Sequence, residues 1–245
     1  KRFPMSWALE GTRSRLGKLM PPKYGILKYV IDAAHHGGIE DLHIVPFVTS
    51  FDLIRDVEEY AAEQTGQAKK PESLSWFLGY LKSLREPMGR VRIDLGAPVV
   101  VKVAPDPEDR MALSRIAFDA SVSANRVTPL TVTAVMCLAL LGTAPRGATA
   151  EELARLTRFI ADWARARDIR LSEELAEFDR DEIRATADKL VNSGLILRDD
   201  AGRETVYTLD PAKHPMASYY RNSVIHHFLD KTLIELALFR LEEEC

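Results

Sequence analysis

The sequence has little of what marks several common classes of protein. It has only two cysteines, Cys137 and Cys245, so it carries no disulfide framework, which favours a reducing compartment. Its longest apolar run, Leu130 to Leu141, is shorter than the roughly 20 residues of a membrane-spanning helix and predicts a buried core helix. No Cys/His cluster indicates a metal site. The formal charge of -3 lacks the basic excess that is typical of a dedicated nucleic-acid-binding protein.

The composition is that of an ordinary globular protein, with 46% hydrophobic and 28% charged residues over 245 positions. That length suits one large or two modest domains. The charge is unevenly spread, because residues 1–28 contain seven basic side chains and one acidic side chain. We therefore expect an anionic partner near the front of the chain. The chain starts without a signal-peptide pattern and ends directly after a helical pattern, so we expect a piece of a longer protein.

The first hundred residues show an α/β pattern. A strand over 3–9, a loop over 10–23, a helix over 24–34 and an apolar strand over 42–48 follow one another. This order is typical of a βαβ unit, so we expect a parallel sheet. The pattern also predicts helices over 52–64 and 74–84, strands over 91–95 and 99–103, and a domain boundary in the proline-rich stretch 104–109.

The rest of the chain is mainly helical. Thr149 and Glu152 form a capping box that starts one helix. A helix over 180–193 followed by a hairpin over 195–209 has winged-helix character, which raises DNA binding as an alternative. The charges of that helix are balanced in sign, whereas a helix that reads DNA should be basic, so we expect a packing or interaction module. A last helical pattern covers 216–241 and contains His226 and His227, which should point apart on a helix and so should not share a metal.

The segment with the clearest chemistry is the basic loop over residues 10–25. Arg13 and Arg15 carry forked, permanently charged donors that suit a phosphate or carboxylate. Gly11 and Gly17 allow tight turns or a close approach to a ligand. The loop therefore predicts an anion site, and a solvated basic loop is the alternative. The hydroxyl groups of Thr12 and Ser14 and the ammonium group of Lys18 add further donors.

The motifs of this loop resemble those of a known family. Residues 10–15 (EGTRSR), the following GK and PPKYG are similar to the signature block of the glycerol-3-phosphate acyltransferases, and the related dihydroxyacetone-phosphate acyltransferases share it. The proline-containing strand over 42–52, the helix over 56–66 with KKPES, and residues 96–98 (GAP) match in order and spacing. Residues 219–222 (YYRN) resemble the C-terminal region of the bacterial, membrane-associated members, although aromatic packing, with Arg221 bonded to a helix end or a carboxylate, would also account for them.

The resemblance implies a fold and an activity. Residues 1–104 would be the second half of an α/β acyltransferase domain with a mixed sheet, and residues 105–245 a mainly α-helical C-terminal domain. The activity would transfer an acyl group from acyl-CoA or acyl-carrier protein to the 1-hydroxyl of glycerol 3-phosphate, without a cofactor, at the cytoplasmic face of the inner membrane through peripheral contact. The substrate-binding residues would be Arg13 and Arg15, which hold the phosphate, with Glu10, Gly11, Thr12, Ser14 and Lys18.

The chain departs from the family pattern in its catalytic residues. The family uses a His, four residues, Asp pair upstream of EGTRSR, where the His is the general base and the Asp orients it. His36 and Asp41 have this spacing, but they follow EGTRSR and lie between a helix and a strand, so we interpret them as non-catalytic. We therefore expect this chain alone to be inactive. The alternatives are a dihydroxyacetone-phosphate acyltransferase and a non-catalytic binding protein with the same fold.

Overall fold

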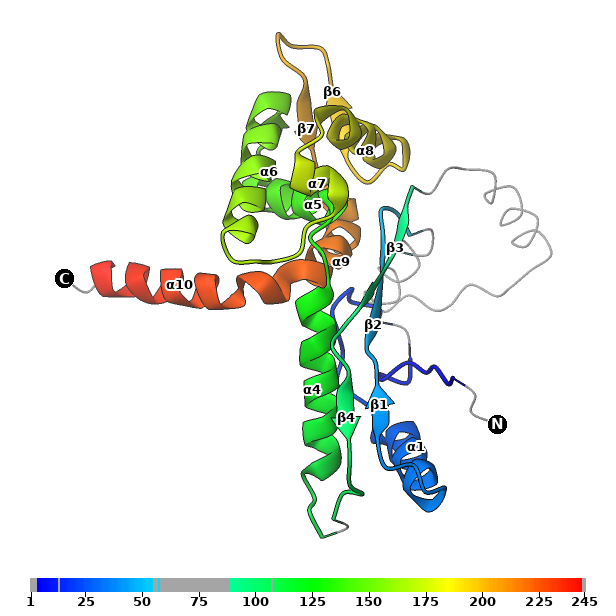
Figure 1. The fold of residues 1–245 in the computed structure, drawn as a ribbon. Coiled ribbons are helices and arrows are strands. Elements are labelled where there is room, and N and C mark those ends of the chain that lie inside the picture. The colour runs from blue at the N-terminus through cyan, green and yellow to red at the C-terminus, as the bar shows by residue number, and fades with distance from the viewer. Residues whose placement is uncertain (1–3, 13, 55–56, 58–88, 107, 244–245) are drawn as a thin grey trace. The chain divides into compact units, whose positions relative to one another are not determined.

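The computed structural model describes residues 4–12, 14–54, 57, 89–106 and 108–243. The chain divides into two compact units whose segments alternate along the sequence (Figure 1). The first unit comprises Lys1–Ser14, Leu19–Thr49 and Arg92–Thr128, and the second comprises Arg15–Lys18, Ser50–Val91 and Pro129–Cys245. The chain is a mixture of helices and small sheets with a helical C-terminal part, in agreement with an α/β class.

The first unit packs helices α1 (Tyr24–His36) and α4 (Ala112–Val127) with strands β1 (Leu42–Ile44) and β4 (Val99–Val101). Helix α1 confirms the helix predicted from residue 24, and Gly37 ends it by donating its N–H to the carbonyl of Ala33 at 3.0 Å. The core of the unit is small. The described buried residues that form its main contact cluster are Leu27, Ile31, Ile44, Val101 and Ala117.

The described strands between residues 42 and 101 form two consecutive two-stranded sheets, which together make a ribbon that is interrupted near Pro46. Strand β1 pairs with β4 in antiparallel register, with Ile44 opposite Val99. Strand β2 (Phe47–Phe51) pairs with β3 (Val91–Leu95). The N–H of Gly96 bonds to the carbonyl of Pro46 at 2.8 Å, and the N–H of Asp52 bonds to the carbonyl of Arg90 at 3.1 Å, so this pair is antiparallel too.

The expected parallel sheet is therefore wrong for the strands described. The predicted strand over 42–48 is divided into β1 and β2 at Pro46, which has no N–H to donate to a neighbour. The register shifts there by one residue. Ile44 pairs with Val99 and Pro46 pairs with Gly96, so the segment from 96 to 99 is one residue longer than the segment from 44 to 46 that it faces, as in a β-bulge. The strand expected over 3–9 is wrong over Pro4–Leu9, which has no strand conformation. No described strand pairs with it.

The second unit is built around helix α5 (Val132–Thr143), which confirms the core helix predicted from the apolar run. Eight of its twelve residues are buried. Cys137 is fully buried, and burial raises the pKa of its thiol to about 12, so it fills the core as expected. The ring of Trp163 stacks on that of Phe228 at 4.9 Å between centroids.

The next elements along the chain are β5 (Ala148–Thr149), α6 (Ala150–Arg165), α7 (Glu173–Glu177), α8 (Arg180–Asn192), β6 (Leu197–Asp199) and β7 (Val206–Thr208). The three strands form an antiparallel sheet in the order β5–β7–β6, which covers part of this core. The predicted capping residue Thr149 accepts the N–H of Glu152 at 3.1 Å and starts α6. The predicted helix and hairpin near residues 180–209 are confirmed as α8, β6 and β7.

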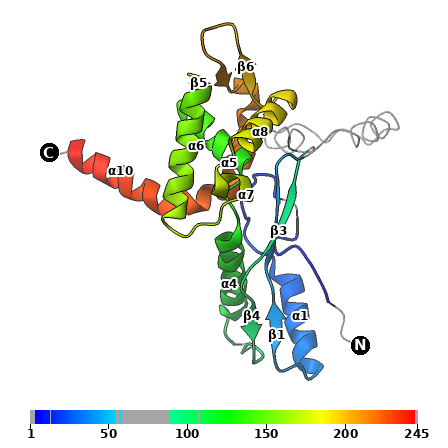
Figure 2. The same ribbon diagram turned by 45° about the horizontal axis from the view of Figure 1, so that its top comes forward.

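The last helical pattern is broken into three pieces: α9 (His214–Val224), a 3-10 turn over Ile225–Phe228, and α10 (Leu229–Glu243). In that turn the rings of His226 and His227 lie with centroids 4.0 Å apart, so the expectation that they point apart was wrong. Helix α10 extends from this turn away from the other helices of the second unit (Figures 1 and 2). Within the described ranges, no helix has the length and hydropathy to cross a bilayer.

Candidate functional site

The basic loop is divided between the two units. Glu10, Gly11, Thr12 and Ser14 belong to the first unit. Arg15 and Lys18, with the two residues between them, belong to the second. Arg13, the other predicted phosphate ligand, lies outside the described residues, as do Cys245 and most of the predicted helices over 52–64 and 74–84.

The first half of the loop is a turn held by backbone hydrogen bonds. The N–H of Gly11 donates to the carbonyl of Ala8 at 3.0 Å, and the N–H of Lys23 donates to the carbonyl of Leu9 at 2.8 Å. Gly11 has a φ of +66°, a conformation that glycine adopts without strain. The two backbone bonds close the base of the loop. Thr12 is exposed and Ser14 is half-buried.

Glu10 is a half-buried carboxylate at the base of this turn. Burial raises its pKa above the ordinary value, and a hydrogen bond from the backbone N–H of Met20 lowers it by a smaller amount. One of its oxygens, Oε2, is buried without a hydrogen-bond partner among the described residues. The contact of Glu10 with Met20 ties the two arms of the loop together.

The second half of the loop is fixed against helix α9. Gly17 has a φ of +78°, and a Cβ atom at this position would lie 2.0 Å from the carbonyl oxygen of Tyr219. Only glycine allows the two backbones to approach this closely. The next contact is made by the amide of Asn222, whose Nδ2 donates to the carbonyl of Leu16 at 2.8 Å. Arg15 and Lys18 lie on either side of these two anchored residues, and both are exposed.

This anchoring shows what residues 219–222 contact, a point that the resemblance alone did not decide. Residues 219–222 were expected either to be functional or to serve aromatic packing. Tyr220 is buried and its hydroxyl accepts the N–H of Ile54 at 2.9 Å, which is a packing role. Tyr219 and Asn222 instead contact the basic loop. The partners are separated by 206 positions in the chain, so no local pattern could have indicated this contact.

His36 and Asp41 form no hydrogen bond or ion pair with each other in the described part of the chain. His36 is the last residue of α1, is exposed, and places its Nδ1 2.7 Å from the carbonyl oxygen of Asp32. Asp41 is exposed immediately before β1. The imidazole is thus engaged by the end of its own helix rather than by the carboxylate of Asp41.

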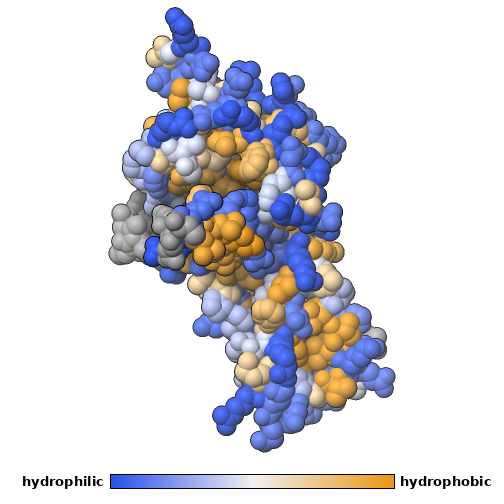
Figure 3. Space-filling view, turned by 90° about the vertical axis from the view of Figure 1, so that its left-hand side faces the viewer, coloured by the Kyte–Doolittle hydropathy of each residue, from blue (hydrophilic) through white to orange (hydrophobic). Residues whose placement is uncertain are grey.

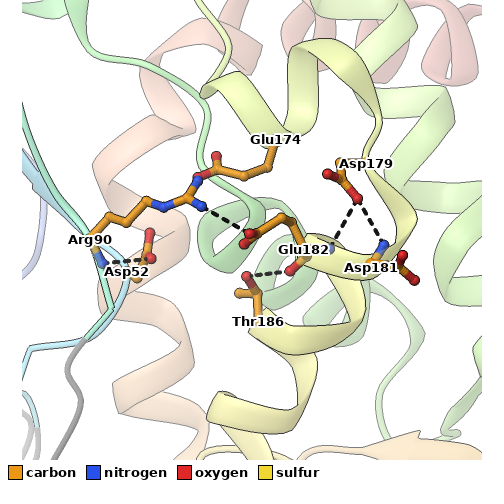
Figure 4. A network of polar contacts seen from close by, with 7 residues as sticks. All are labelled: Asp52, Arg90, Glu174, Asp179, Asp181, Glu182 and Thr186. Atoms are coloured by element: carbon orange, nitrogen blue, oxygen red, sulfur yellow. Dashed lines mark hydrogen bonds and ion pairs between the residues drawn. The ribbon is translucent and has the colours of Figure 1, made fainter.

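A polar network that the sequence did not indicate lies within the second unit (Figure 4). The buried carboxylate of Asp52 accepts the N–H of Arg90 at 2.8 Å. The guanidinium of Arg90 forms ion pairs with Glu174 of α7 and, at 3.0 Å, with Glu182 of α8. The pKa of Arg90 is raised, chiefly by the negative charge of Glu174. The network attaches positions 52 and 90 to two helices and is structural.

The network also bears on the DNA-binding alternative. Glu182 of α8 is engaged by Arg90, and Asp188 of the same helix forms an ion pair with Arg198 of β6 at 3.1 Å. These acidic side chains bind cations of their own chain and would repel a phosphate backbone. Among the described residues, no group of three or more His, Cys, Asp or Glu side chains could hold a metal ion.

Comparison with known proteins places the chain in a family. Residues 60–244 match the model of the glycerol-3-phosphate acyltransferase C-terminal region. The acyltransferase candidates plsB1 of Mycobacterium tuberculosis and Mycobacterium bovis are 34% identical over 245 residues, covering 98% of this chain and 39% of theirs. A glycerol-3-phosphate acyltransferase of Pasteurella multocida is 24% identical over 260 residues, covering 98% of this chain and 31% of its own.

These matches define the class of the chain as the C-terminal region of an acyltransferase family. The chain belongs to the glycerol-3-phosphate acyltransferase family, and residues 60–244 correspond to the C-terminal region of that family. It spans less than two fifths of the length of the relatives given above.

Proposed function

We propose that the protein containing this chain is a glycerol-3-phosphate 1-O-acyltransferase of phospholipid synthesis. The observation that carries the proposal is the basic loop over residues 10–18, which turns at two positive-φ glycines and is anchored at residues 16 and 17 by α9. An anchored loop can hold forked cations in a fixed position, and this suits recognition of a phosphate monoester. Membership of the family supports glycerol 3-phosphate as this ester.

In this proposal the loop binds the acceptor and another region performs the chemistry. Arg13 and Arg15 bind the phosphate, Lys18, Thr12 and Ser14 add donors, and Gly11 and Glu10 shape the turn. A His–Asp pair supplied outside residues 1–245 takes the proton of the 1-hydroxyl. The hydroxyl oxygen then attacks the thioester carbonyl of acyl-CoA or acyl-carrier protein. The C–S bond breaks, the thiol leaves with a proton, and lysophosphatidic acid is formed.

The acceptor role of the loop is tested by acyl-transfer kinetics with the native protein. We expect Arg15→Gln and Arg13→Ala to raise the KM for glycerol 3-phosphate about 10- to 100-fold, the effect of losing a charge-assisted hydrogen bond. Arg180→Gln is the matched control, because Arg180 is an exposed arginine of α8 in the second unit. An unchanged KM in both loop variants would contradict the phosphate role. A lower KM for dihydroxyacetone phosphate than for glycerol 3-phosphate would favour the alternative acceptor.

Residues 1–245 alone test whether the catalytic pair lies outside this chain. We expect no acyl transfer from this chain, because its one His, four residues, Asp match, His36 and Asp41, is not paired. Acyl transfer by the chain alone that survives His36→Ala would show that another base is present. Acyl transfer that His36→Ala abolishes would show that His36 is the base.

We propose peripheral membrane contact at the cytoplasmic face of the inner membrane, through α10. Figure 3 views the molecule from the side toward which α10 points and shows hydrophobic side chains exposed there. The large apolar side chains of α10 are all more than 50% exposed, which is unusual for a helix in water. They are Leu229, Leu233, Ile234, Leu236, Leu238, Phe239 and Leu241.

Liposome flotation tests this contact. The helix has two basic and four acidic residues, so its binding should depend on apolar burial and little on anionic lipid. We expect the native protein to float with phosphatidylcholine vesicles and the Leu233→Asp/Leu236→Asp variant to float far less. Phe118→Asp is the control, since Phe118 is 64% exposed on α4 of the first unit. Equal flotation of native protein and the α10 variant would exclude this helix as the contact.

A further inference from the structure

A third arginine lies beside the anchored half of the loop. Arg221 follows Tyr220 on α9 and directs its Nε and Nη2 atoms to the Oδ1 of Asn222, at 3.1 and 2.8 Å. The same Asn222 amide donates through Nδ2 to the carbonyl of Leu16 at 2.8 Å. The guanidinium of Arg221 is thus two hydrogen bonds away from the residue that follows Arg15.

The amide of Asn222 is oriented by both contacts. Its oxygen must face the guanidinium of Arg221, because the latter has only donors. Its nitrogen therefore faces the loop carbonyl. Gly17, one residue further, is in backbone contact with Tyr219, so the loop cannot move away from α9 without losing both anchors. Helix α9 therefore fixes the place of Arg221 relative to residues 15–18.

The hydrogen-bond partner of Arg221 does not neutralise its charge. Asn222 offers an uncharged oxygen, and Arg221 forms no ion pair with a carboxylate in the part of the chain described. Other arginines of the second unit do form such pairs, among them Arg90, Arg146 and Arg198. Arg221 is also half-buried. A partly desolvated cation without a counter-charge is costly, and a bound anion would offset that cost.

We propose that Arg221 is a further phosphate-binding residue of the acceptor site, and that Asn222 is the positioning residue that holds it beside the loop. The inference rests on the proposed function of the loop and extends it to α9. The ligand chemistry is a phosphate monoester dianion. Arg221 presents one edge of its guanidinium to Asn222, and its remaining N–H groups can donate to a phosphate oxygen.

Direct binding tests this inference independently of catalysis. Calorimetry of glycerol 3-phosphate, without acyl donor, is measured on the native protein and on Arg221→Gln, with Arg180→Gln as the charge-matched control. We expect Arg221→Gln to raise the Kd about 10- to 100-fold and the control to leave it unchanged. Glycerol should not bind measurably to any of them, because it lacks the phosphate.

The conservative variants separate binding from folding. Arg221→Lys keeps the charge but cannot grip Asn222 with two nitrogen atoms, so we expect a Kd raised several-fold with the Tm unchanged. Asn222→Leu should raise the Kd and also loosen the loop, seen as faster amide exchange at residues 16–18. If Arg221→Gln does not fold, Arg221→Lys decides the question, and an unchanged Kd overturns the proposal.

The outcomes for the loop and for α9 are distinguishable. An unchanged Kd in Arg221→Gln together with a raised Kd in Arg15→Gln overturns the role of Arg221 and leaves the proposed function standing. Unchanged Kd values in both variants overturn the phosphate site as a whole. Raised Kd values in both, with no acyl transfer by the native protein, support Arg221 and contradict the proposed enzymatic activity.

Discussion

The two units of the chain differ greatly in how much apolar surface they bury. Among the residues that the structure describes, the hydrophobic cluster at the core of the second unit contains 24 buried residues, whereas that of the first contains five. In the first unit, Phe47, Ile93 and Leu95 of the ribbon are each more than half exposed. The register places Phe47 opposite Leu95, so these side chains share one face. Burial of apolar area is the main stabilising contribution in folding, so we expect the second unit to be much the more stable.

The largest expected effect is the difference in unfolding free energy between truncating a buried leucine of the second unit and truncating an exposed leucine of the first. Leu140→Ala removes a buried side chain of α5 and should lower the free energy of unfolding by about 2–5 kcal/mol. Leu95→Ala truncates a side chain that is 63% exposed and should change it by no more than about 0.5 kcal/mol. Urea unfolding followed by circular dichroism measures both. Equal losses would show that the face of the ribbon is covered in solution.

A smaller effect is expected from a hydroxyl of the second unit. Tyr220→Phe removes the acceptor for the N–H of Ile54 and should cost about 1 kcal/mol in the free energy of unfolding. Tyr29→Phe is the control in the first unit, because Tyr29 is 75% exposed and should show no change. Thermal unfolding measures both variants. A larger loss of stability in Tyr29→Phe than in Tyr220→Phe would contradict the expected difference between the two units.

The smallest effect is a pH dependence in the first unit. The folded-state pKa of Glu10 is raised by burial, so its ionised form costs folding free energy. This cost develops as the pH rises from the unfolded pKa to the folded one, and it is fully present above the folded pKa. Glu10→Gln should therefore stabilise the protein slightly at pH 7 and leave its stability unchanged at pH 3.

The control for this prediction is Glu108→Gln, which changes an exposed carboxylate of the same unit. Its unfolding curves should match those of the native protein at both pH values. A loss of stability at pH 7 in Glu10→Gln would mean that the ionised carboxylate contributes more through the N–H of Met20 than its burial costs.

Local patterns predicted the helices well. The apolar stripe of α1, the apolar run of α5 and the Thr149 cap of α6 each depend on residues within a few positions of one another. The sheet was predicted less well, because pairing partners such as Ile44 and Val99 are distant in the sequence and Pro46 divided the strand. The parallel sheet was expected from element order alone, and element order does not determine which strands pair.

The candidate site was predictable in its residue types but not in its supports. Arg15 and Gly17 were found because a short motif contains them. The contacts of Leu16 with Asn222 and of Gly17 with Tyr219 join segments about 200 residues apart, which no motif or periodicity reports. The network of Asp52, Arg90 and Glu174 was missed for the same reason. Single charged residues without a motif around them carry no signal of their partners.

The alternation of the two units along the chain has a consequence for biosynthesis. The described core of the second unit includes Val57 and extends to Phe228, so residues near position 57 emerge from the ribosome long before their packing partners. At a synthesis rate of roughly 5–20 residues per second, that wait lasts about 10–30 seconds. The first unit, whose last segment ends at Thr128, can assemble during this time. Early apolar segments of the second unit would then be the natural binding sites for a chaperone during translation.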